Sequence, residues 1–412
     1  MRFHLLFRRA AAWSGVPVRG TVTFKPKPVA IPDRHFLMMG VLALLAAGCT
    51  ISDPKPVPWP DQADSTGVRA ITESPSLCRE CIVLDPLITI GDTAGPGYIE
   101  ETSDVVRDSA GNYWVGQRRM IKVFDSTGTF LRQVGRAGAG PMEFERPRPV
   151  HTDATGRVHI FDRNGRETIV GADFALYEER ELPGLVQAAF PLQDAHRYVA
   201  SMWLGTPDRI GFPLHIIDGS AVMRSFGLRG DQSDGQLSQF NSQRVLTVDA
   251  QSHIFSTRLY HYVIEAWTTT GNRIVGFEGP ELNQTEPLPG RFAPDNPPPN
   301  RIFAIRVDDA ARLWVISWQR RPDWQDAVID QVQPNGEVIS LPKDGDFSYD
   351  RLYTSRLDVI DLNAASLIAR VNQDNLFVGF IGSVSILEAE YLDDGTPRLV
   401  VWDAAIVNAG SS

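Results

Sequence analysis

Five times along this 412-residue chain, a short apolar segment leads into an aspartate, a polar turn and a second apolar segment. The five aspartates are Asp108, Asp153, Asp194, Asp249 and Asp308, and they lie 45, 41, 55 and 59 residues apart. An aspartate that opens a turn accepts hydrogen bonds from the backbone two residues on, and glycine or a small polar residue supplies the reversal. Each unit therefore predicts a tight β-hairpin, and the spacing is typical of propellers and solenoids.

A second hairpin follows the first in the clearest units. Residues 121–125 and 129–134 flank a turn that ends at Gly128, and residues 263–267 and 273–277 flank one that ends at Gly271. Four short strands without an amphipathic helix describe a propeller blade. One such sheet cannot cover both of its half-apolar faces, so the blades must stack. The sequence thus predicts an all-β propeller of four-stranded antiparallel blades.

These units resemble the NHL-like, six-bladed β-propeller proteins of bacterial envelopes, over about residues 78–406. The resemblance includes a C-x-x-C pair before the first strand, a glycine-rich link at 135–144, and closing stretches at 357–362 and 397–402. It implies a ring of six blades. It implies no single activity.

The ring is expected to close through its first ordered strand. Five aspartate-led units account for blades 1–5, whereas residues 376–402 offer only three strands for blade 6. We expect residues 82–90 to supply the fourth strand, and Pro86 fits there because proline is tolerated on an edge strand.

Blade 5 is expected to carry a long insertion, roughly 318–354, between its second and third strands. In the alternative, 328–332 and 338–341 form the outer hairpin of that blade. We favour the insertion, because the alternative leaves 352–372 unplaced.

The N-terminal region contains a 12-residue apolar run, 36–47, that ends at Gly48 and Cys49. A bilayer-spanning helix needs about 20 residues, whereas a run of this length after Arg34 fits the core of a signal peptide. Its end resembles the bacterial lipoprotein signal, in which the cysteine is lipidated and becomes the new N-terminus. We predict a signal peptide over 1–48, with translation starting nearer Val29, and lipidation of Cys49. The alternative is a buried apolar segment that ends in a chance cysteine.

The net charge of −10 argues against a nucleic-acid partner. Removal of 1–48 would take away seven basic residues and one acidic residue and leave −16. Residues 49–81 begin with a stretch rich in proline, aspartate and serine, so we predict a lipid-anchored tether there. The propeller is expected over 82–407. We expect a monomer exported to the cell envelope, on the outer membrane facing the periplasm or the exterior.

Cys78 and Cys81 form the C-x-x-C pair, which suits a redox site, half of a zinc site or a local disulfide. The sequence has no second C-x-x-C pair and no histidine pair at ligand spacing, which disfavours zinc. The pair precedes a strand rather than a helix, which disfavours redox catalysis. We expect a local disulfide in an exported protein, and neither a metal nor a cofactor.

The loops that join the second and third strands are expected on one face of the ring. They carry Arg118, Arg119, Arg163, Arg166, Arg209, Arg258, Arg320, Arg321 and Arg351. Guanidinium groups bind carboxylate or phosphate in a bidentate fashion, and Trp318 and Trp324 of the insertion add rings on which a sugar or a planar group could stack. In the alternative, these arginines pair with neighbouring acidic residues and tie the blades together.

Two classes of function stay open. The first is a non-enzymatic module that binds a protein, a peptide, or an anionic or glycan ligand on the arginine face. The second is a metal-dependent hydrolase or lyase similar to the calcium-dependent lactonases, with carboxylate and asparagine ligands in the channel. Such ligands are expected at the starts of the innermost strands, where the sequence has Val105, Val150, Val245 and Ala304, with only Asp104 and Asn300 nearby. Because there are so few candidate metal ligands, the sequence favours the binding module over the metal-dependent enzyme.

Overall fold

The computed structural model describes residues 67–407, except 101–103, 194–195, 228–242, 281, 283–291, 295, 334–335, 337, 344–348 and 393–394. Apart from two 3₁₀ turns, η1 (Trp324–Ala327) and η2 (Tyr349–Arg351), the regular elements of this part are all strands. It contains no helix long and apolar enough to cross a membrane. The predicted signal peptide, Cys49, most of the tether and Asp194 lie outside the described residues.

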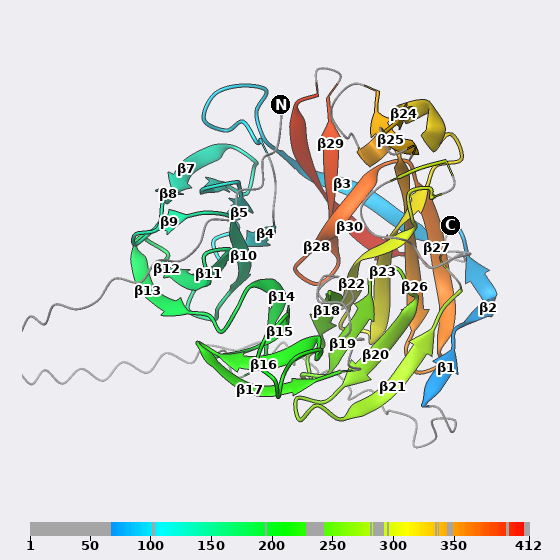
Figure 1. The fold of residues 1–412 in the computed structure, drawn as a ribbon, viewed down its shortest axis with the longest axis horizontal. Helices are drawn as coiled ribbons and strands as arrows, with labels where there is room; N and C mark the ends of the chain where they lie inside the picture. Colours follow the sequence, from blue (N-terminus) through cyan, green and yellow to red (C-terminus); the bar gives the residue numbers. More distant parts are fainter. Residues whose placement is uncertain are drawn as a thin grey trace, which may run out of the picture. The chain divides into compact units, whose positions relative to one another are not determined.

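Six sheets follow one another along the chain, and Figure 1 shows them arranged around a centre. Blade 1 is β4 (Val105–Arg107), β5 (Tyr113–Gly116), β6 (Ile121–Phe124) and β7 (Phe130–Val134), and blade 2 is β10 (Pro147–Thr152), β11 (Val158–Asp162), β12 (Arg166–Val170) and β13 (Leu176–Glu181). A short parallel pair, β8 (Arg136–Ala137) with β9 (Glu143–Phe144), links these two blades. Blade 3 is β14 (Val186–Pro191), β15 (Arg197–Met202), β16 (Leu214–Asp218) and β17 (Ala221–Phe226).

Blades 4 to 6 follow the same antiparallel order, with the innermost strand first. Blade 4 has β18 (Arg244–Val248), β19 (Ile254–Arg258), β20 (Val263–Trp267) and β21 (Arg273–Glu278). Blade 5 has β22 (Arg301–Val307), β23 (Arg312–Arg320), β26 (Tyr353–Asp361) and β27 (Ser366–Gln373). Blade 6 has β28 (Leu376–Ile381), β29 (Ser385–Tyr391), β30 (Pro397–Ile406) and β3 (Ile82–Ile90).

The innermost strands make the arrangement a closed ring. Strand β4 contacts β10, and contacts continue in order through β14, β18 and β22 to β28, which contacts β4 again. The predicted six-bladed propeller is therefore confirmed.

The outer strand of the last blade comes from the N-terminal side, as expected, although β3 is not the first ordered strand of the chain. Strand β3 pairs antiparallel with β30, from Ile82 opposite Ile406 to Ile90 opposite Leu399. Pro86 lies on this outer strand, at an irregularity of the ladder. Because β3 precedes blade 1 in the chain, the pairing holds the two ends of the ring together without a covalent bond.

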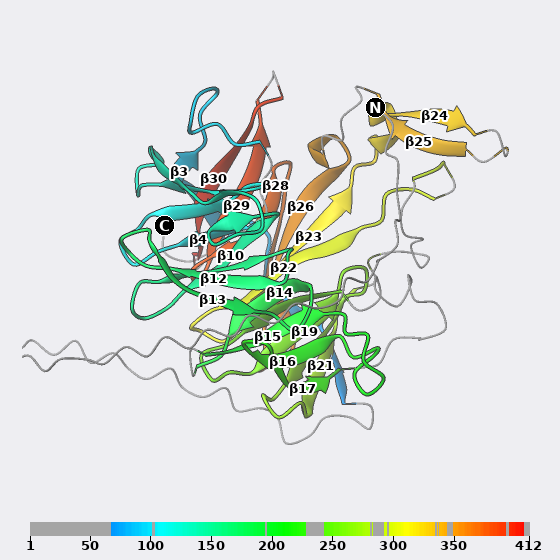
Figure 2. The ribbon, with the colours of Figure 1, turned by 60° about the vertical axis from the view of Figure 1, so that its left-hand side comes forward.

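Blade 5 confirms the predicted insertion. Strand β23 pairs directly with β26, from Arg312 opposite Asp361 to Arg320 opposite Tyr353. Between them lie η1, η2 and a separate hairpin of β24 (Val328–Val332) and β25 (Val338–Pro342). Figure 2 shows this hairpin projecting from the rest of the blade.

The structure corrects the end of the predicted tether, 49–81, because residues 68–70 and 72–78 form strands there. Strand β1 (Val68–Ala70) pairs parallel with β21 at the outer edge of blade 4, and β2 (Thr72–Cys78) pairs parallel with β27 at the outer edge of blade 5. An outer strand presents unpaired backbone N–H and C=O groups, and an extended segment can pair with them whatever its side chains. One N-terminal stretch therefore borders blades 4, 5 and 6 in turn.

The core lies between blades. Within the described residues, buried hydrophobic side chains form six clusters, and each joins two adjacent blades. Trp114 of blade 1 packs with Ile160 of blade 2, and Ile90 of blade 6 packs with Val115 of blade 1. Each sheet thus covers its apolar faces with its neighbours, which is the reason that a single blade would not be stable alone.

The aspartate turns have the predicted hydrogen bonds. Asp308 Oδ1 accepts from the backbone N–H groups of Ala310 and Arg312, both at 2.9 Å, and Oδ2 accepts from Trp314 Nε1 at 2.8 Å. Asp108 makes the same bonds to the residues two, four and six positions on. The tryptophan six residues after the aspartate also enters an inter-blade cluster, so one carboxylate fixes both the turn and a core side chain.

Candidate functional site

The predicted arginines do gather at the junctions between second and third strands, but they differ in their contacts. Arg118, Arg119 and Arg163 lie exposed in these loops, Arg351 is exposed in η2, and Arg258 ends β19. Arg209 Nε lies 3.3 Å from the carboxylate of its neighbour Asp208.

Three of the arginines donate to backbone carbonyls. Arg166 Nη2 donates to the carbonyls of Gly140 at 3.0 Å and Glu143 at 2.7 Å. Arg321 Nε donates to the carbonyl of Asp350 at 2.7 Å, and Arg320 Nη1 donates to that of Pro298 at 3.3 Å. These contacts support the interpretation that the three side chains hold loops in place.

The two candidate stacking rings are core residues. Trp318 stacks on Phe303 with ring centroids 4.3 Å apart, and its Nε1 donates to the carbonyl of Phe377. The guanidinium carbon of Arg301 lies 4.4 Å from the centroid of the Trp318 ring. Trp324 is buried in the same cluster between blades 5 and 6. Trp318 is 3% and Trp324 5% exposed, so neither ring offers an open face to a sugar.

The structure joins Cys78 and Cys81 by a disulfide. Cys78 is the last residue of β2, and Cys81 is buried against blades 5 and 6. The bond lies where the chain passes from the outer edge of blade 5 to that of blade 6.

A cavity of about 340 Å³ lies among the innermost strands β4, β10, β14, β22 and β28. Its wall is mainly apolar, with Val105, Val150, Phe190 and Phe380 among the side chains that line it. Its polar groups come from Asp104, Arg107, Arg148, His151, Thr152 and Arg306. Side chains of blades 1, 2, 3, 5 and 6 thus meet in one space at the centre of the ring.

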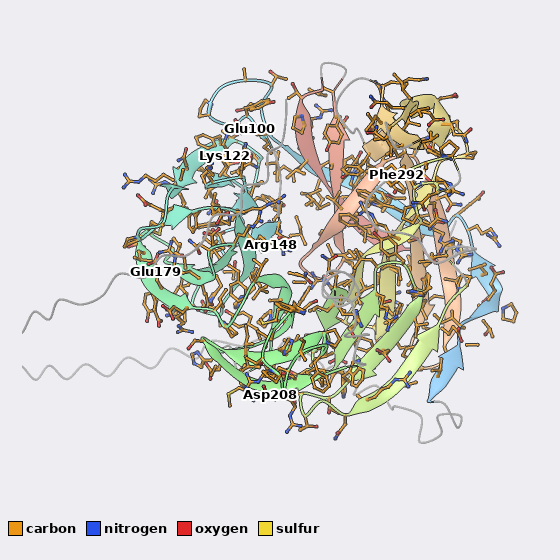
Figure 3. The ribbon with its side chains drawn as sticks, viewed as in Figure 1. Glu100, Lys122, Arg148, Glu179, Asp208 and Phe292 are labelled. Carbon is orange, nitrogen blue, oxygen red and sulfur yellow. A yellow bond between two sulfur atoms is a disulfide. The ribbon has the colours of Figure 1, made fainter. Side chains whose placement is uncertain are left out.

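Arg148 and Asp104 form an ion pair on the cavity wall. Arg148 Nε donates to Asp104 Oδ2 at 2.5 Å, and its Nη1 donates to the carbonyl of Gln187. Burial opposes the charge of Arg148, but the carboxylate outweighs it and raises the pKa of the guanidinium above its ordinary value. Both side chains remain about one-third exposed, at 34% and 38%. Figure 3 shows Arg148 at the inner edge of blade 2, on the side of the channel.

Arg306 has no such counter-charge within the ranges that the structure describes. It lies on β22, two residues before the turn aspartate Asp308, and its Nη2 donates a long 3.4 Å bond to the carbonyl of Phe380. Its guanidinium carbon lies 5.1 Å from the ring centroid of Phe190. Its Nε is buried and has no hydrogen-bond partner among the described residues. Burial alone lowers the pKa of Arg306 to about 10, so it is charged at neutral pH.

His151 supplies a neutral polar group to the same cavity. Its ring stacks on that of His159 with centroids 4.3 Å apart, and its Nδ1 is buried without a partner in the described part of the chain. Burial, and then the neighbouring His159, lower the pKa of His151 to about 3. His151 is therefore uncharged at neutral pH.

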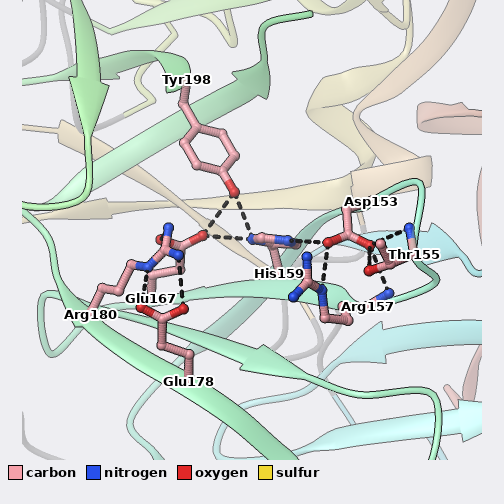
Figure 4. A network of polar contacts seen from close by, with 8 residues as sticks. All are labelled: Asp153, Thr155, Arg157, His159, Glu167, Glu178, Arg180 and Tyr198. Atoms are coloured by element: carbon pink, nitrogen blue, oxygen red, sulfur yellow. Dashed lines mark hydrogen bonds and ion pairs between the residues drawn. The ribbon is translucent and has the colours of Figure 1, made fainter. Parts of the chain in front are cut away.

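A buried network behind His151 fixes the position of His159 (Figure 4). Glu167 Oε1 lies 2.8 Å from His159 Nδ1 and accepts a 2.8 Å bond from the hydroxyl of Tyr198. Asp153 Oδ2 lies 3.4 Å from the other ring nitrogen, Nε2. The carboxylate of Asp153 thus holds its turn and also reaches the histidine that supports the cavity wall.

Acid is expected to destabilise the propeller through its buried neutral histidines. His215 is fully buried, its Nε2 lies 3.0 Å from the carbonyl of Phe212, and burial lowers its pKa to about 4. The unfolded chain takes up this proton near pH 6.5, so the contribution is fully present above that pH and is lost as the pH falls towards 4. The loss amounts to about 3 kcal/mol.

Urea unfolding at pH 7, 5.5 and 4 measures this effect. A His215→Gln variant should lose less stability than the wild type over this range. Equal losses in the two proteins would show that His215 is not the group responsible.

Four polar residues of the cavity, Arg107, Arg148, His151 and Arg306, were not predicted from the sequence, because polar side chains were expected only at the first positions of the innermost strands. Strand β10 begins at Pro147, before Val150, so Arg148 belongs to it. A charged or polar residue shortly before the turn aspartate, inside an otherwise apolar strand, would have indicated a side chain that lines the cavity. Arg107, His151 and Arg306 all have this position.

The two candidate metal ligands named from the sequence differ in outcome. Asp104 does line the cavity. The side chain of Asn300 instead donates to the carbonyl of Leu282 at 2.7 Å and accepts from the backbone N–H of Arg320 at 2.6 Å. Over the described ranges, no three histidine, cysteine or acidic side chains lie together in a way that could hold a metal ion.

Comparison with known proteins gives similarity of structure alone. No protein-family model and no curated protein matches the sequence. A Bacteroides fragilis protein inferred to be exported is similar over 83% of this chain and 100% of its own, with 12% identity and a TM-score of 0.52. A DUF4221 member from Bacteroides vulgatus matches over 80% and 98%, with 9% identity and a TM-score of 0.49. Virginiamycin B lyase from Staphylococcus aureus matches over 78% and 99%, with 11% identity and a TM-score of 0.43. At such identities the likeness concerns the fold.

Proposed function

We propose that this protein is an exported, lipid-anchored β-propeller of NHL-like type that binds an anionic ligand in its central cavity without transforming it. The observation that carries this proposal is Arg306, a charged side chain that lines the cavity and whose buried Nε has no partner in the part of the chain that the structure describes. A charge removed from water is costly unless it is paired. A bound anion supplies that pairing.

The charges around the cavity favour an anion over a cation. Asp104, the one carboxylate among its described lining residues, is already paired with Arg148. His151 is neutral and Arg107 is exposed to solvent, so Arg306 is left as the buried charge without compensation among the described lining residues. The chain as a whole is acidic, at −10, and a cationic pocket with low-dielectric walls concentrates anions there.

The described lining favours binding over catalysis. A calcium-dependent hydrolase would need six to eight oxygen ligands around its ion, and the lining offers the carboxylate of Asp104 and the hydroxyl of Thr152. The Thr152 hydroxyl donates to the carbonyl of Arg107 rather than to a general base.

The proposed location rests on the N-terminal sequence. The apolar run 36–47 followed by Cys49 supports export and lipidation, and the similar Bacteroides fragilis protein is inferred to be exported. Radiolabelled palmitate should be incorporated into the wild type and not into Cys49→Ser, and only the wild type should sediment with membranes. Equal labelling of the two proteins would overturn the anchor.

Calorimetric titration of the purified full chain tests the cavity. Hexanoate, benzoate, phosphate and citrate are the probes, with hexanol as the neutral control. At least one anion should bind, and Arg306→Gln should weaken it at least about tenfold, the cost of losing a charged hydrogen-bond partner. The exposed Arg118→Gln should leave the affinity unchanged. Loss of binding in Arg118→Gln with full binding in Arg306→Gln would place the site on the outer loops and overturn the proposal.

A further inference from the structure

We infer that the ligand is a small apolar monocarboxylate, an acyl or aryl acid, with its carboxylate on Arg306 and its hydrocarbon part against Phe190 and Phe380. This inference rests on the proposed function and names the ligand class of the same cavity. It follows from three properties of the lining: its charge, its donors and its apolar walls.

The charge of the cavity suits one negative group. Arg148 is neutralised by Asp104 at 2.5 Å. Arg107 is exposed, and its Nε donates to the carbonyl of Gly111 in the neighbouring turn. Among the described lining residues, Arg306 therefore stands as the one buried cation without a counter-charge, and a second or third charge on the ligand beside it would lie against apolar wall or the Asp104 carboxylate. Burying such an unpaired charge is unfavourable.

The donors on Arg306 suit a carboxylate. Its Nε is covered, whereas part of the side chain is exposed to the cavity. Its Nη2 has one long bond, 3.4 Å to the carbonyl of Phe380, and a charged acceptor replaces such a contact readily. Phe190 lies over the guanidinium at 5.1 Å and helps to hold its plane. The terminal nitrogens can then hold both oxygens of one carboxylate.

The walls suit a hydrocarbon. Besides Phe190 and Phe380, the side chains of Val105, Val150 and Ile381 line the cavity. Its volume, about 340 Å³, lies at the small end of the range for small-molecule sites. Each methylene buried in such a space tightens binding about fourfold. The affinity should therefore rise with chain length until the cavity is full.

Titration of the wild-type full chain with acetate, butyrate, hexanoate, octanoate and benzoate tests this class, with phosphate, citrate and hexanol for comparison. We expect Kd to fall about fourfold per added methylene from acetate to hexanoate, and phosphate, citrate and hexanol each to bind at least about tenfold more weakly than hexanoate. Phe380→Ala should flatten the dependence on chain length and leave the Kd of acetate within about twofold. Arg306→Gln should weaken every carboxylate and leave hexanol unchanged.

The possible results separate the two proposals. Phosphate or citrate that binds as tightly as hexanoate, or affinity independent of chain length, overturns the ligand class while the anion site stands. Absence of binding by every anion overturns both. The wild-type series alone decides between these results, so a variant that fails to fold does not remove the test.

Discussion

Replacement of Ile90 by aspartate should prevent the ring from closing and leave the chain unfolded. Ile90 ends β3, lies opposite Leu399 of β30, and is fully buried in the cluster between blades 6 and 1. Loss of its hydrocarbon alone costs about 2–5 kcal/mol, and burial of a carboxylate adds several more. Domains are stable by only about 5–15 kcal/mol, so the substitution removes most or all of the stability. Circular dichroism with urea unfolding measures it.

Leu87→Asp is the matched control. Leu87 lies on the same strand and is 56% exposed, so the same substitution should change the stability by no more than about 0.5 kcal/mol. Similar stability of the two variants would mean that β3 does not complete blade 6.

Asp358→Ala should cost about 3–5 kcal/mol, the usual effect of removing one partner of a buried ion pair. Asp358 is fully buried in β26. Its Oδ1 accepts from Arg370 Nε at 2.6 Å, and its Oδ2 lies 3.3 Å from Arg356 Nε and accepts from the hydroxyl of Tyr262 at 3.0 Å. Without the carboxylate, the guanidinium of Arg356 loses this counter-charge, and that of Arg370 is left with the exposed Glu73, 3.5 Å away.

Asp374→Ala is the control for this prediction, because Asp374 pairs with Arg321 at 3.5 Å but its side chain is 87% exposed. Exposed pairs contribute about 0–1 kcal/mol. Thermal and urea unfolding of the two variants compare them. An Asp358→Ala protein as stable as Asp374→Ala would show that the blade 4–5 contact does not depend on this carboxylate.

The fold was predictable because its determinants are local in the sequence. Asp108, Asp153, Asp249 and Asp308 each hold their own turn through backbone hydrogen bonds within four residues. A recurring local signal of this kind fixes the hairpins, and exposed apolar faces then require the blades to stack.

The N-terminal pairing was only partly predictable. Strand β3 has alternating buried apolar residues, which mark it as a strand. Strands β1 and β2 pair through backbone groups at blade edges, and most of their side chains stay partly or fully exposed. Edge pairing of this kind leaves little hydrophobic pattern in the sequence.

The cavity was not predictable, because it depends on which inward side chains of separate blades meet. Asp104 and Arg148 are 44 residues apart in the chain, and Arg306 meets the carbonyl of Phe380 across 74 residues. Similarly, the sequence predicts Arg166 and Arg321 at loops, although Arg166 begins β12, and it does not show that backbone carbonyls accept hydrogen bonds from both side chains.

Co-crystals of the full chain with 4-bromobenzoate test most directly whether a monocarboxylate binds inside the ring. We expect an anomalous bromine peak within the cavity, among β4, β10, β14 and β28, with the carboxylate in hydrogen-bond contact with Arg306. Bromine peaks confined to the outer loops around Arg118 and Arg119, with water alone beside Arg306, would contradict it.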